Sequence, residues 1–319
     1  MQQKQFCGVV VPMVTPVHED GTLDTVAVER LVGSFAEAGV SPLLMGTTGE
    51  GNSVSQADGL LMVETAVKAR RERPSDLPVW ISNTASQRPT TIYAGLTGNC
   101  FSEQLRQAEA YTRAGADVIV ATLPTYYVLT PEQMENYYRQ LADAIEGPLM
   151  LYNILATTHM SIPVDVVRHL ADHPNIVGLK DSERDLERMA QCIAIARERP
   201  DFSYFCGWAA QSARSLAMGG DGIVPSTGNY VPEMFQQLYE AAIAGDTAEA
   251  ERLQAVTNEI AKIYQQDRTL GQSLAALKVM LHAKGLCEPW MLMPLTRLST
   301  EEEASIKKWK VESKSSNSE

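Results

Sequence analysis

The sequence has few cysteines, no clustered cations and no long apolar run. Its five cysteines are widely spaced, and no two form a Cys-x-x-Cys pair: Cys7, Cys100, Cys192, Cys206 and Cys287. This spacing argues against a disulfide scaffold and against a thiolate zinc site. The histidines form no His-Glu-x-x-His pattern, so we assign no metal site. His169 and His173 are four residues apart, and we expect them to lie on a solvated helix face.

The sequence also lacks the positive charge that binding to a polyanion requires. Its formal net charge is -12 at pH 7, and its pI is near 5.0. Phosphate binding needs clustered Lys and Arg, so we expect no nucleic-acid partner. No segment approaches the roughly 18 uninterrupted apolar residues of a spanning helix, so we expect no membrane partner. The N-terminal segment lacks the features of a secretory signal peptide, and we expect a soluble cytoplasmic protein.

The chain is long enough for one large α/β barrel with an appendage or for two ordinary domains. It has 319 residues, of which 45% are hydrophobic and 21% are charged. These proportions are ordinary for a globular protein and exclude wholesale disorder. We therefore expect a packed core of enzyme size.

Short apolar runs alternate with longer amphipathic segments, a pattern typical of βαβ units and a parallel sheet. About eight such strand–helix pairs fit the chain, which is the number that closes a (β/α)8 TIM barrel. We assign residues 1–245 to a catalytic barrel, 246–312 to a C-terminal extension with three helical stretches, and 313–319 to a disordered tail. Residues 74–89 interrupt the rhythm and are interpreted as an insertion. The third strand then lies in 91–99, because Ser102 would cap the following helix.

The active site of such a barrel lies where its strands end, so the residues there are the candidates for chemistry. Lys180 closes the apolar run 176–179. Burial would lower the pKa of its amine and make it a nucleophile toward a carbonyl substrate. Alternatively, Lys180 reaches the rim or pairs with Asp181 or Glu183, and the lysine alone favours that alternative. Tyr152, which ends the preceding strand, could pass protons to an imine and so favours the catalytic interpretation.

The turn 46–49, Gly-Thr-Thr-Gly, offers hydroxyls and backbone N–H groups that suit a carboxylate, although a turn built only for its geometry is about equally plausible. Glu50, next to it, is interpreted as structural. Tyr126 and Tyr127 follow the fourth strand and could equally be core or rim aromatics.

Four motifs occur in order at strand ends: Gly-Thr-Thr-Gly-Glu, Pro-Thr-Tyr-Tyr, Leu-Tyr-Asn and Gly-Leu-Lys-Asp. Together they resemble the dihydrodipicolinate synthase and N-acetylneuraminate lyase family of class I aldolases, and the likeness covers nearly the whole chain. The resemblance implies that Lys180 forms an imine with pyruvate or a related 2-oxo acid. It implies that Tyr152 relays protons, and that Thr47 and Thr48 hold the substrate carboxylate, with one hydroxyl linked to Tyr152.

The resemblance has further implications for the assembly and the pocket. A tyrosine from a neighbouring subunit completes the proton relay in this family, and the spacing from Pro124 favours Tyr126 over Tyr127 for that role. Gly207 and Val224 match positions that line the pocket. Family members are typically homotetramers built from two tight dimers, and their imine chemistry needs no metal or organic cofactor.

The chain departs from the family pattern after the fifth strand. Relatives that make dihydrodipicolinate carry an arginine for the second substrate's carboxylate five residues after the strand-five tyrosine, where this chain has Thr157. His159 stands where the family usually has glycine. We therefore expect a Schiff-base lyase or aldolase acting on a carbon–carbon bond next to a 2-oxo acid, and not a true dihydrodipicolinate synthase. Two alternatives stay open: a dehydratase of a 2-keto-3-deoxy sugar acid, and a non-catalytic barrel that binds oxo acids.

Overall fold

The computed structural model describes residues 4–71 and 90–306 of the chain. Within these residues, eight parallel strands pair in chain order and close into a barrel, because the last strand pairs with the first. The strands are β1 (Gly8–Pro12), β2 (Ser41–Leu44), β3 (Tyr93–Leu96), β4 (Val118–Thr122), β5 (Leu149–Asn153), β6 (Ile176–Asp181), β7 (Ser203–Cys206) and β8 (Gly222–Ile223). The predicted (β/α)8 barrel is confirmed.

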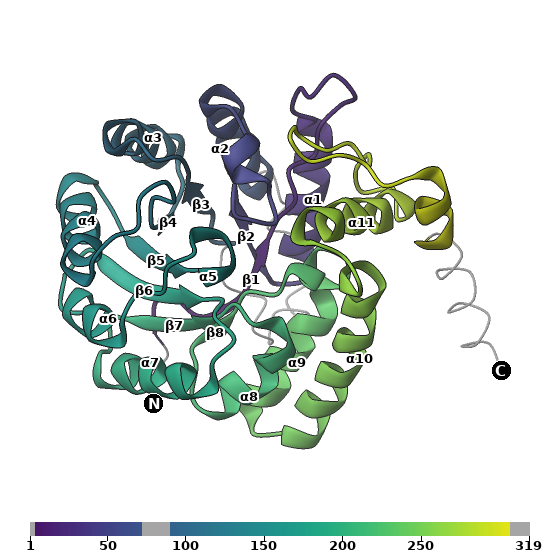
Figure 1. Ribbon diagram of the computed structural model, residues 1–319. Coiled ribbons are helices and arrows are strands. Elements are labelled where there is room, and N and C mark those ends of the chain that lie inside the picture. The colour runs from purple at the N-terminus through teal and green to yellow at the C-terminus, as the bar shows by residue number, and fades with distance from the viewer. Residues whose placement is uncertain (1–3, 72–89, 307–319) are drawn as a thin grey trace.

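Helices surround the barrel as an outer layer (Figure 1). They are α1 (Thr25–Glu37), α2 (Gln56–Arg71), α3 (Phe101–Ala114), α4 (Pro131–Ala144), α5 (Leu155–Thr158), α6 (Val164–Leu170), α7 (Leu186–Glu198), α8 (Ser212–Ala217) and α9 (Pro232–Ala244). Local capping explains several of their starts. Asp24 and Asp185 accept N–H bonds from the first turns of α1 and α7, and Thr130 forms a capping box with Gln133 at α4.

The core has two parts, because each strand is buried on both of its faces. Side chains that point outward pack against the helices in one large cluster. Side chains that point inward fill the barrel: Phe6, Val10, Leu43, Tyr93, Val118, Val120, Met150, Tyr152, Ile154, Phe205 and Val224. Tyr152 and Val224, two of the predicted site residues, therefore belong to the packed interior.

The C-terminal extension begins after Gly245, which ends α9 in a left-handed conformation that suits glycine. It contains α10 (Thr247–Gln265), α11 (Leu270–Ala283) and a last helix that begins at residue 300 and is described as far as residue 306. Helix α10 packs on α8 and α9, and α11 lies beside α10 (Figure 1). The extension thus covers one side of the barrel.

The structure corrects two local predictions and leaves one untested. Cys100 occupies the N-cap position of α3, and Ser102 lies inside its first turn, so the predicted Ser102 cap is wrong. His169 is exposed on α6, but His173 follows that helix and is only 11% exposed, with its Nε2 3.0 Å from Asp143, so the expectation of a solvated face is wrong for His173. The predicted insertion 74–89 lies outside the described residues.

Two kinds of feature are absent from the described part of the chain. No helix there is long and apolar enough to cross a bilayer. No group of three or more His, Cys, Asp or Glu side chains there is arranged to hold a metal ion.

Candidate active site

Lys180 is a buried amine next to the last residue of β6. Its side chain is 3% exposed, and its Nζ lies 3.6 Å from the centroid of the Tyr152 ring. The two residues face each other because β5 and β6 pair with Tyr152 opposite Lys180. Burial lowers the pKa of Lys180 below its ordinary value, and the neighbouring Tyr152 only partly offsets this effect. The geometry favours an uncharged, nucleophilic amine.

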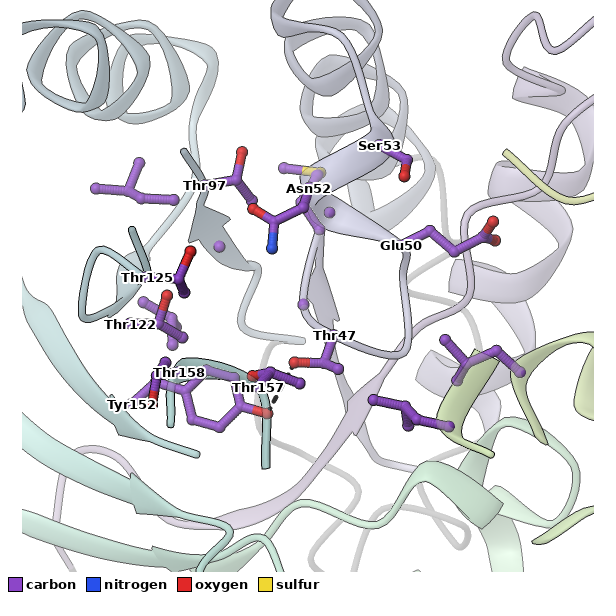
Figure 2. A pocket seen from close by; sticks show the side chains of 18 of the residues that line it. Thr47, Glu50, Asn52, Ser53, Thr97, Thr122, Thr125, Tyr152, Thr157 and Thr158 are labelled. Atoms are coloured by element: carbon purple, nitrogen blue, oxygen red, sulfur yellow. Dashed lines mark hydrogen bonds between the residues drawn. The ribbon is translucent and has the colours of Figure 1, made fainter. Parts of the chain in front are cut away.

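The Tyr152 hydroxyl connects this amine to the turn after β2. It shares a hydrogen bond of 3.2 Å with the Thr47 hydroxyl, in which either oxygen can be the donor. Figure 2 shows the two groups pointing toward one another. An amine, a phenol and a hydroxyl therefore stand in a row, which is an arrangement that can pass protons between a bound substrate and the protein.

The turn that carries Thr47 and Thr48 is tightly held. Within it, Glu50 N donates to the Thr47 carbonyl and Gly51 N to the Gly46 carbonyl. The Thr15 hydroxyl donates to the Gly49 carbonyl at 2.5 Å. A Cβ atom on Gly49 would lie 2.7 Å from the Met13 carbonyl oxygen, so only glycine allows the turn to approach the end of β1 this closely.

Glu50 anchors the same turn to the C-terminal extension. Its side chain is buried and forms an ion pair with Lys278 of α11, with 2.5 Å between Oε1 and Nζ. Its other oxygen accepts a bond from Leu292 N at 2.8 Å, and Lys278 also donates to the Trp290 carbonyl. The interpretation of Glu50 as a structural residue is thus supported, and its partners come from the last third of the chain.

A second buried polar network lies behind the amine and the phenol. Asn153 donates to Asp181 and to Glu183, at 2.9 Å in each case. Arg188 of α7 donates to Asp181 at 2.7 Å, and its Nε lies 3.5 Å from Glu183. Since Asn153 follows Tyr152 and Asp181 follows Lys180, this network holds the ends of β5 and β6 in register.

A cavity of about 990 Å³ opens onto Lys180. Six of the eight predicted site residues line it: Thr47, Thr48, Tyr152, Lys180, Gly207 and Val224. A Cβ atom at Gly207 would lie 2.2 Å from the Ser182 hydroxyl and 3.0 Å from the Asp181 carbonyl oxygen, so glycine keeps β6 and β7 close at this edge. This cavity is the candidate active site.

Thr157 lies elsewhere. It lines a smaller cavity of about 310 Å³, together with Thr47, Tyr152 and several other threonines shown in Figure 2. Among the described residues, Thr157 is not part of the lining of the Lys180 cavity. Thr47 and Tyr152 border both spaces, so they stand between Thr157 and Lys180. The loop that carries Thr157 forms the short helix α5, which ends at His159 in a left-handed conformation (φ 58°) that glycine adopts most readily.

Tyr126 is also outside the Lys180 cavity. It is 77% exposed and packs edge to face on Tyr127, which is 72% exposed. Asn99 holds this loop by accepting from the backbone N–H groups of Thr125 and Tyr126. Tyr126 thus lies on the surface of the described structure.

Comparison with known families gives a match over residues 5–311 to the model described as "Dihydrodipicolinate synthetase family". The chain belongs to the dihydrodipicolinate synthetase family. It is therefore an enzyme of the class I lyase and aldolase type, as the four motifs indicated.

Three relatives illustrate the range of this family. The chain is 31% identical to 4-hydroxy-tetrahydrodipicolinate synthase of Laribacter hongkongensis, over 92% of this chain and 93% of that one. It is 30% identical to Escherichia coli YjhH, named as a probable 2-dehydro-3-deoxy-D-pentonate aldolase, over 93% and 94%. The crystal structure of E. coli YagE in complex with pyruvate superposes with a TM-score of 0.85 at 25% identity, covering 97% of this chain and 98% of that chain. The first two relatives are named for different reactions, and YagE is described as a member of the dihydrodipicolinic acid synthase family.

The sequence reasoning missed most of the outer wall of the cavity. Ser182 and Arg184 come from the loop after β6, and Trp208 follows Gly207. The ends of α10 and α11 supply the opposite side, with Asn258, Lys262, Gln265, Gln266, Arg268 and Ser273. A polar loop residue or an exposed helix residue carries no pattern that marks it as facing a cavity, although the position of Arg184 four residues after Lys180 could have suggested it.

Proposed function

We propose that this protein is a Schiff-base lyase or aldolase that cleaves or forms a carbon–carbon bond next to a 2-oxo acid. The observation that carries the proposal is the buried Lys180 amine, which has a lowered pKa and lies against Tyr152 in a cavity that also contains Thr47 and Thr48. Desolvation favours the uncharged form of the amine, which is the form that attacks a carbonyl.

In the first half of the proposed reaction, the Lys180 amine attacks the C2 carbonyl and forms a carbon–nitrogen bond. The former carbonyl oxygen takes up one proton from the attacking nitrogen and one from solvent, both relayed through Tyr152 and Thr47. It then leaves as water, which yields a protonated imine. The carboxylate at C1 is held by the Thr47–Thr48 turn, whose hydroxyls and backbone N–H groups are donors.

In the second half, Tyr152 accepts the proton of the C4 hydroxyl while the C3–C4 bond breaks. The bonding electrons flow into the imine, so that an enamine forms and the C4 fragment leaves as an aldehyde. Protonation at C3 and attack of water at C2 then release pyruvate and restore the amine. The positive imine stabilises the charge that develops as the bond breaks. Synthesis is the reverse of these steps.

The relatives support cleavage or synthesis of a 2-oxo acid but differ in the partner. YjhH is named as an aldolase, and YagE was crystallised with pyruvate. Thr157 offers no cation where a dihydrodipicolinate synthase uses arginine, so we do not propose that reaction. A Schiff-base dehydratase would use the same imine and lose water instead of an aldehyde. By the family resemblance, we further propose a cytoplasmic homotetramer built from tight dimers.

The proposal is tested by incubating the protein with pyruvate and borohydride and locating the adduct by mass spectrometry. We expect one adduct on Lys180 and none in Lys180→Ala. A screen of hydroxylated 2-oxo acids then measures pyruvate release, and product masses distinguish release of pyruvate from loss of water. Failure to label Lys180 would refute every imine mechanism and favour a non-catalytic, oxo-acid-binding barrel.

A further inference from the structure

The outer part of the Lys180 cavity carries cations and no carboxylates. Its described lining contains Arg184, Lys262 and Arg268 in addition to Lys180, and neither Asp nor Glu occurs in that lining. This is unusual for a chain with a formal net charge of -12. A cleft lined by charge of one sign raises the local concentration of ligands of the opposite sign. The cavity is therefore electrostatically distinct from the rest of the molecule.

Arg184 is the cation that is most available to a ligand. It is exposed, and no hydrogen bond or ion pair joins it to another residue within 4–71 or 90–306. It lies four residues after Lys180, so the two Cα atoms are at most about 14 Å apart. Lys262, by contrast, forms an ion pair with Glu259 at 2.6 Å.

Arg268 adds a second guanidinium to this lining, from the connection between α10 and α11. Its Nη1 donates to the Ile263 carbonyl, whereas its buried Nε has no partner in the described structure. Glu302 lies near enough for this guanidinium to contribute to the lowered pKa of that carboxyl, after the hydrogen bonds from Ser299. The contact with Ile263 therefore holds Arg268 in the lining of the cavity, where its guanidinium keeps its positive charge.

The size of the cavity indicates that the ligand extends beyond pyruvate. Its volume of about 990 Å³ lies near the upper end of the roughly 300–1,000 Å³ that small-molecule pockets span. The proposed role of the Thr47–Thr48 turn accounts for the C1 carboxylate, so an anion bound by Arg184 and Arg268 would be a second charged group of the ligand. Since Thr157 cannot supply a cation, this second charge would have to be met at a different place from the arginine of dihydrodipicolinate synthases.

We propose that the substrate is a 2-oxo acid with a second anionic group at its far end, and that Arg184, assisted by Arg268, binds this group. The proposal rests on the proposed imine chemistry and adds the substrate class to it. Guanidinium groups bind carboxylate and phosphate equally well in geometry, so the second anion is either of these.

Binding of matched analogues tests this assignment without requiring turnover. 2-Oxoadipate and 2-oxohexanoate have the same chain length, and only the former has a distal carboxylate. A 2-oxo acid of similar length that ends in phosphate forms the third arm. Dissociation constants are measured by competition with the borohydride trapping of pyruvate. For the wild type we expect one of the two analogues with a distal anionic group to bind at least about 10-fold tighter than 2-oxohexanoate. This difference in affinity should decrease as salt is added. The tighter arm identifies the anion.

Two variants assign the effect to the proposed residue. Arg184→Gln is expected to bind the analogue that the wild type prefers only as tightly as it binds 2-oxohexanoate. Arg113→Gln changes the net charge equally, on the exposed face of α3 where Arg113 pairs with Glu109, and is expected to retain the preference. Thermal melting of both variants checks that they are folded.

The outcomes separate the two proposals. Equal binding of all three analogues by a wild type that traps pyruvate on Lys180 would overturn the distal-anion site alone. An unchanged preference in Arg184→Gln would overturn it as well. A wild type that traps no pyruvate would overturn both this site and the imine mechanism.

Discussion

The burial of Lys180 costs stability, because desolvation disfavours the ammonium form. The unfolded chain, with an ordinary lysine pKa of about 10.4, binds the proton more tightly than the folded protein does. Stability therefore increases as pH rises from the lowered pKa toward 10.4, where the cost vanishes. Lys180→Met should raise the melting temperature at pH 7, and the gain should shrink as the pH rises above the lowered pKa of Lys180 toward about 10.4.

Lys262→Met is the control for this prediction, since Lys262 is exposed and pairs with Glu259 at the surface. Its melting temperature should show no comparable gain at pH 7. A Lys180→Met variant that melts below the wild type at neutral pH would mean that the ammonium is well compensated, and the neutral amine would have to be abandoned.

Tyr152→Phe removes the hydroxyl that shares a hydrogen bond with Thr47 and keeps the aromatic ring that packs inside the barrel. Turnover should fall by a factor on the order of 10² to 10⁴, the usual value of a positioned proton donor. Steady-state release of pyruvate measures the effect. Tyr137→Phe is the matched control, because its hydroxyl donates to Gln104 at 3.0 Å and to the Thr122 carbonyl at 3.2 Å, and Tyr137 lines neither of the two cavities. It should cost stability and not turnover.

Sequence reasoning brought Lys180, Tyr152 and Thr47 together because parallel strands place their carboxyl ends at one edge of a barrel. It could not predict the position of Thr157, because Thr157 lies on the short helix α5, and a helix of four residues is too short to show a periodic apolar pattern. It also missed Arg184, because the direction of a loop side chain is set by tertiary structure and not by spacing.

Among the elements, α11 is linked to the turn that carries Thr47 and Thr48 by the buried pair of Glu50 and Lys278. Removing one member of a buried ion pair leaves an uncompensated charge. We therefore expect Glu50→Gln and Lys278→Met each to lower the free energy of unfolding by about 3–5 kcal/mol. The double variant should lose less than the sum. Urea unfolding at pH 7 measures the free energies of unfolding for this double-mutant cycle. The Michaelis constant of Glu50→Gln shows whether the turn that carries Thr47 and Thr48 has become less ordered.

The exposed pair of Arg252 and Glu249, with Nε and Oε2 2.7 Å apart, is the control for this cycle. Its coupling energy should be within about 0.2–1 kcal/mol, as is usual at surfaces. Additive losses at Glu50 and Lys278 would show that the two residues act independently and that the extension does not support the turn through this contact.

The elements themselves were largely predictable. The third strand lies at 93–96, within the predicted segment 91–99, and α10 and α11 lie where the amphipathic pattern places them. The start of α3 was predicted incorrectly, because the sequence alone does not distinguish a serine at the N-cap from a serine in the first turn of a helix. Nor could the pattern tell which surface the extension covers, since amphipathicity shows that a face is buried and not what buries it.

For the whole molecule, the decisive question is whether two subunits share a site. The proposed role of Tyr126 in a neighbouring subunit predicts complementation between two inactive variants, Tyr126→Phe and Lys180→Ala. In a mixed isologous dimer, one site has both an intact lysine and an intact tyrosine. Random mixing should restore about a quarter of the wild-type activity. Steady-state assays after reversible dissociation and reassociation measure the recovery.

Tyr127→Phe serves as the control in the same experiment. It should stay active by itself, since the spacing from Pro124 favours Tyr126. If Tyr127→Phe were the slow variant and complemented Lys180→Ala, the role would pass to Tyr127. If neither mixture recovered activity, each subunit would have to work alone.

The link between Glu50 and α11 also has a consequence for biosynthesis. A nascent polypeptide that has completed all eight strands has not yet made Lys278 or Leu292, the two partners of the Glu50 carboxylate. The barrel can thus close on the ribosome before the turn that carries Thr47 and Thr48 is held by these contacts. We expect the ability to bind an oxo acid to be acquired last, and products that terminate shortly before residue 278 to be inactive even where the barrel itself has formed.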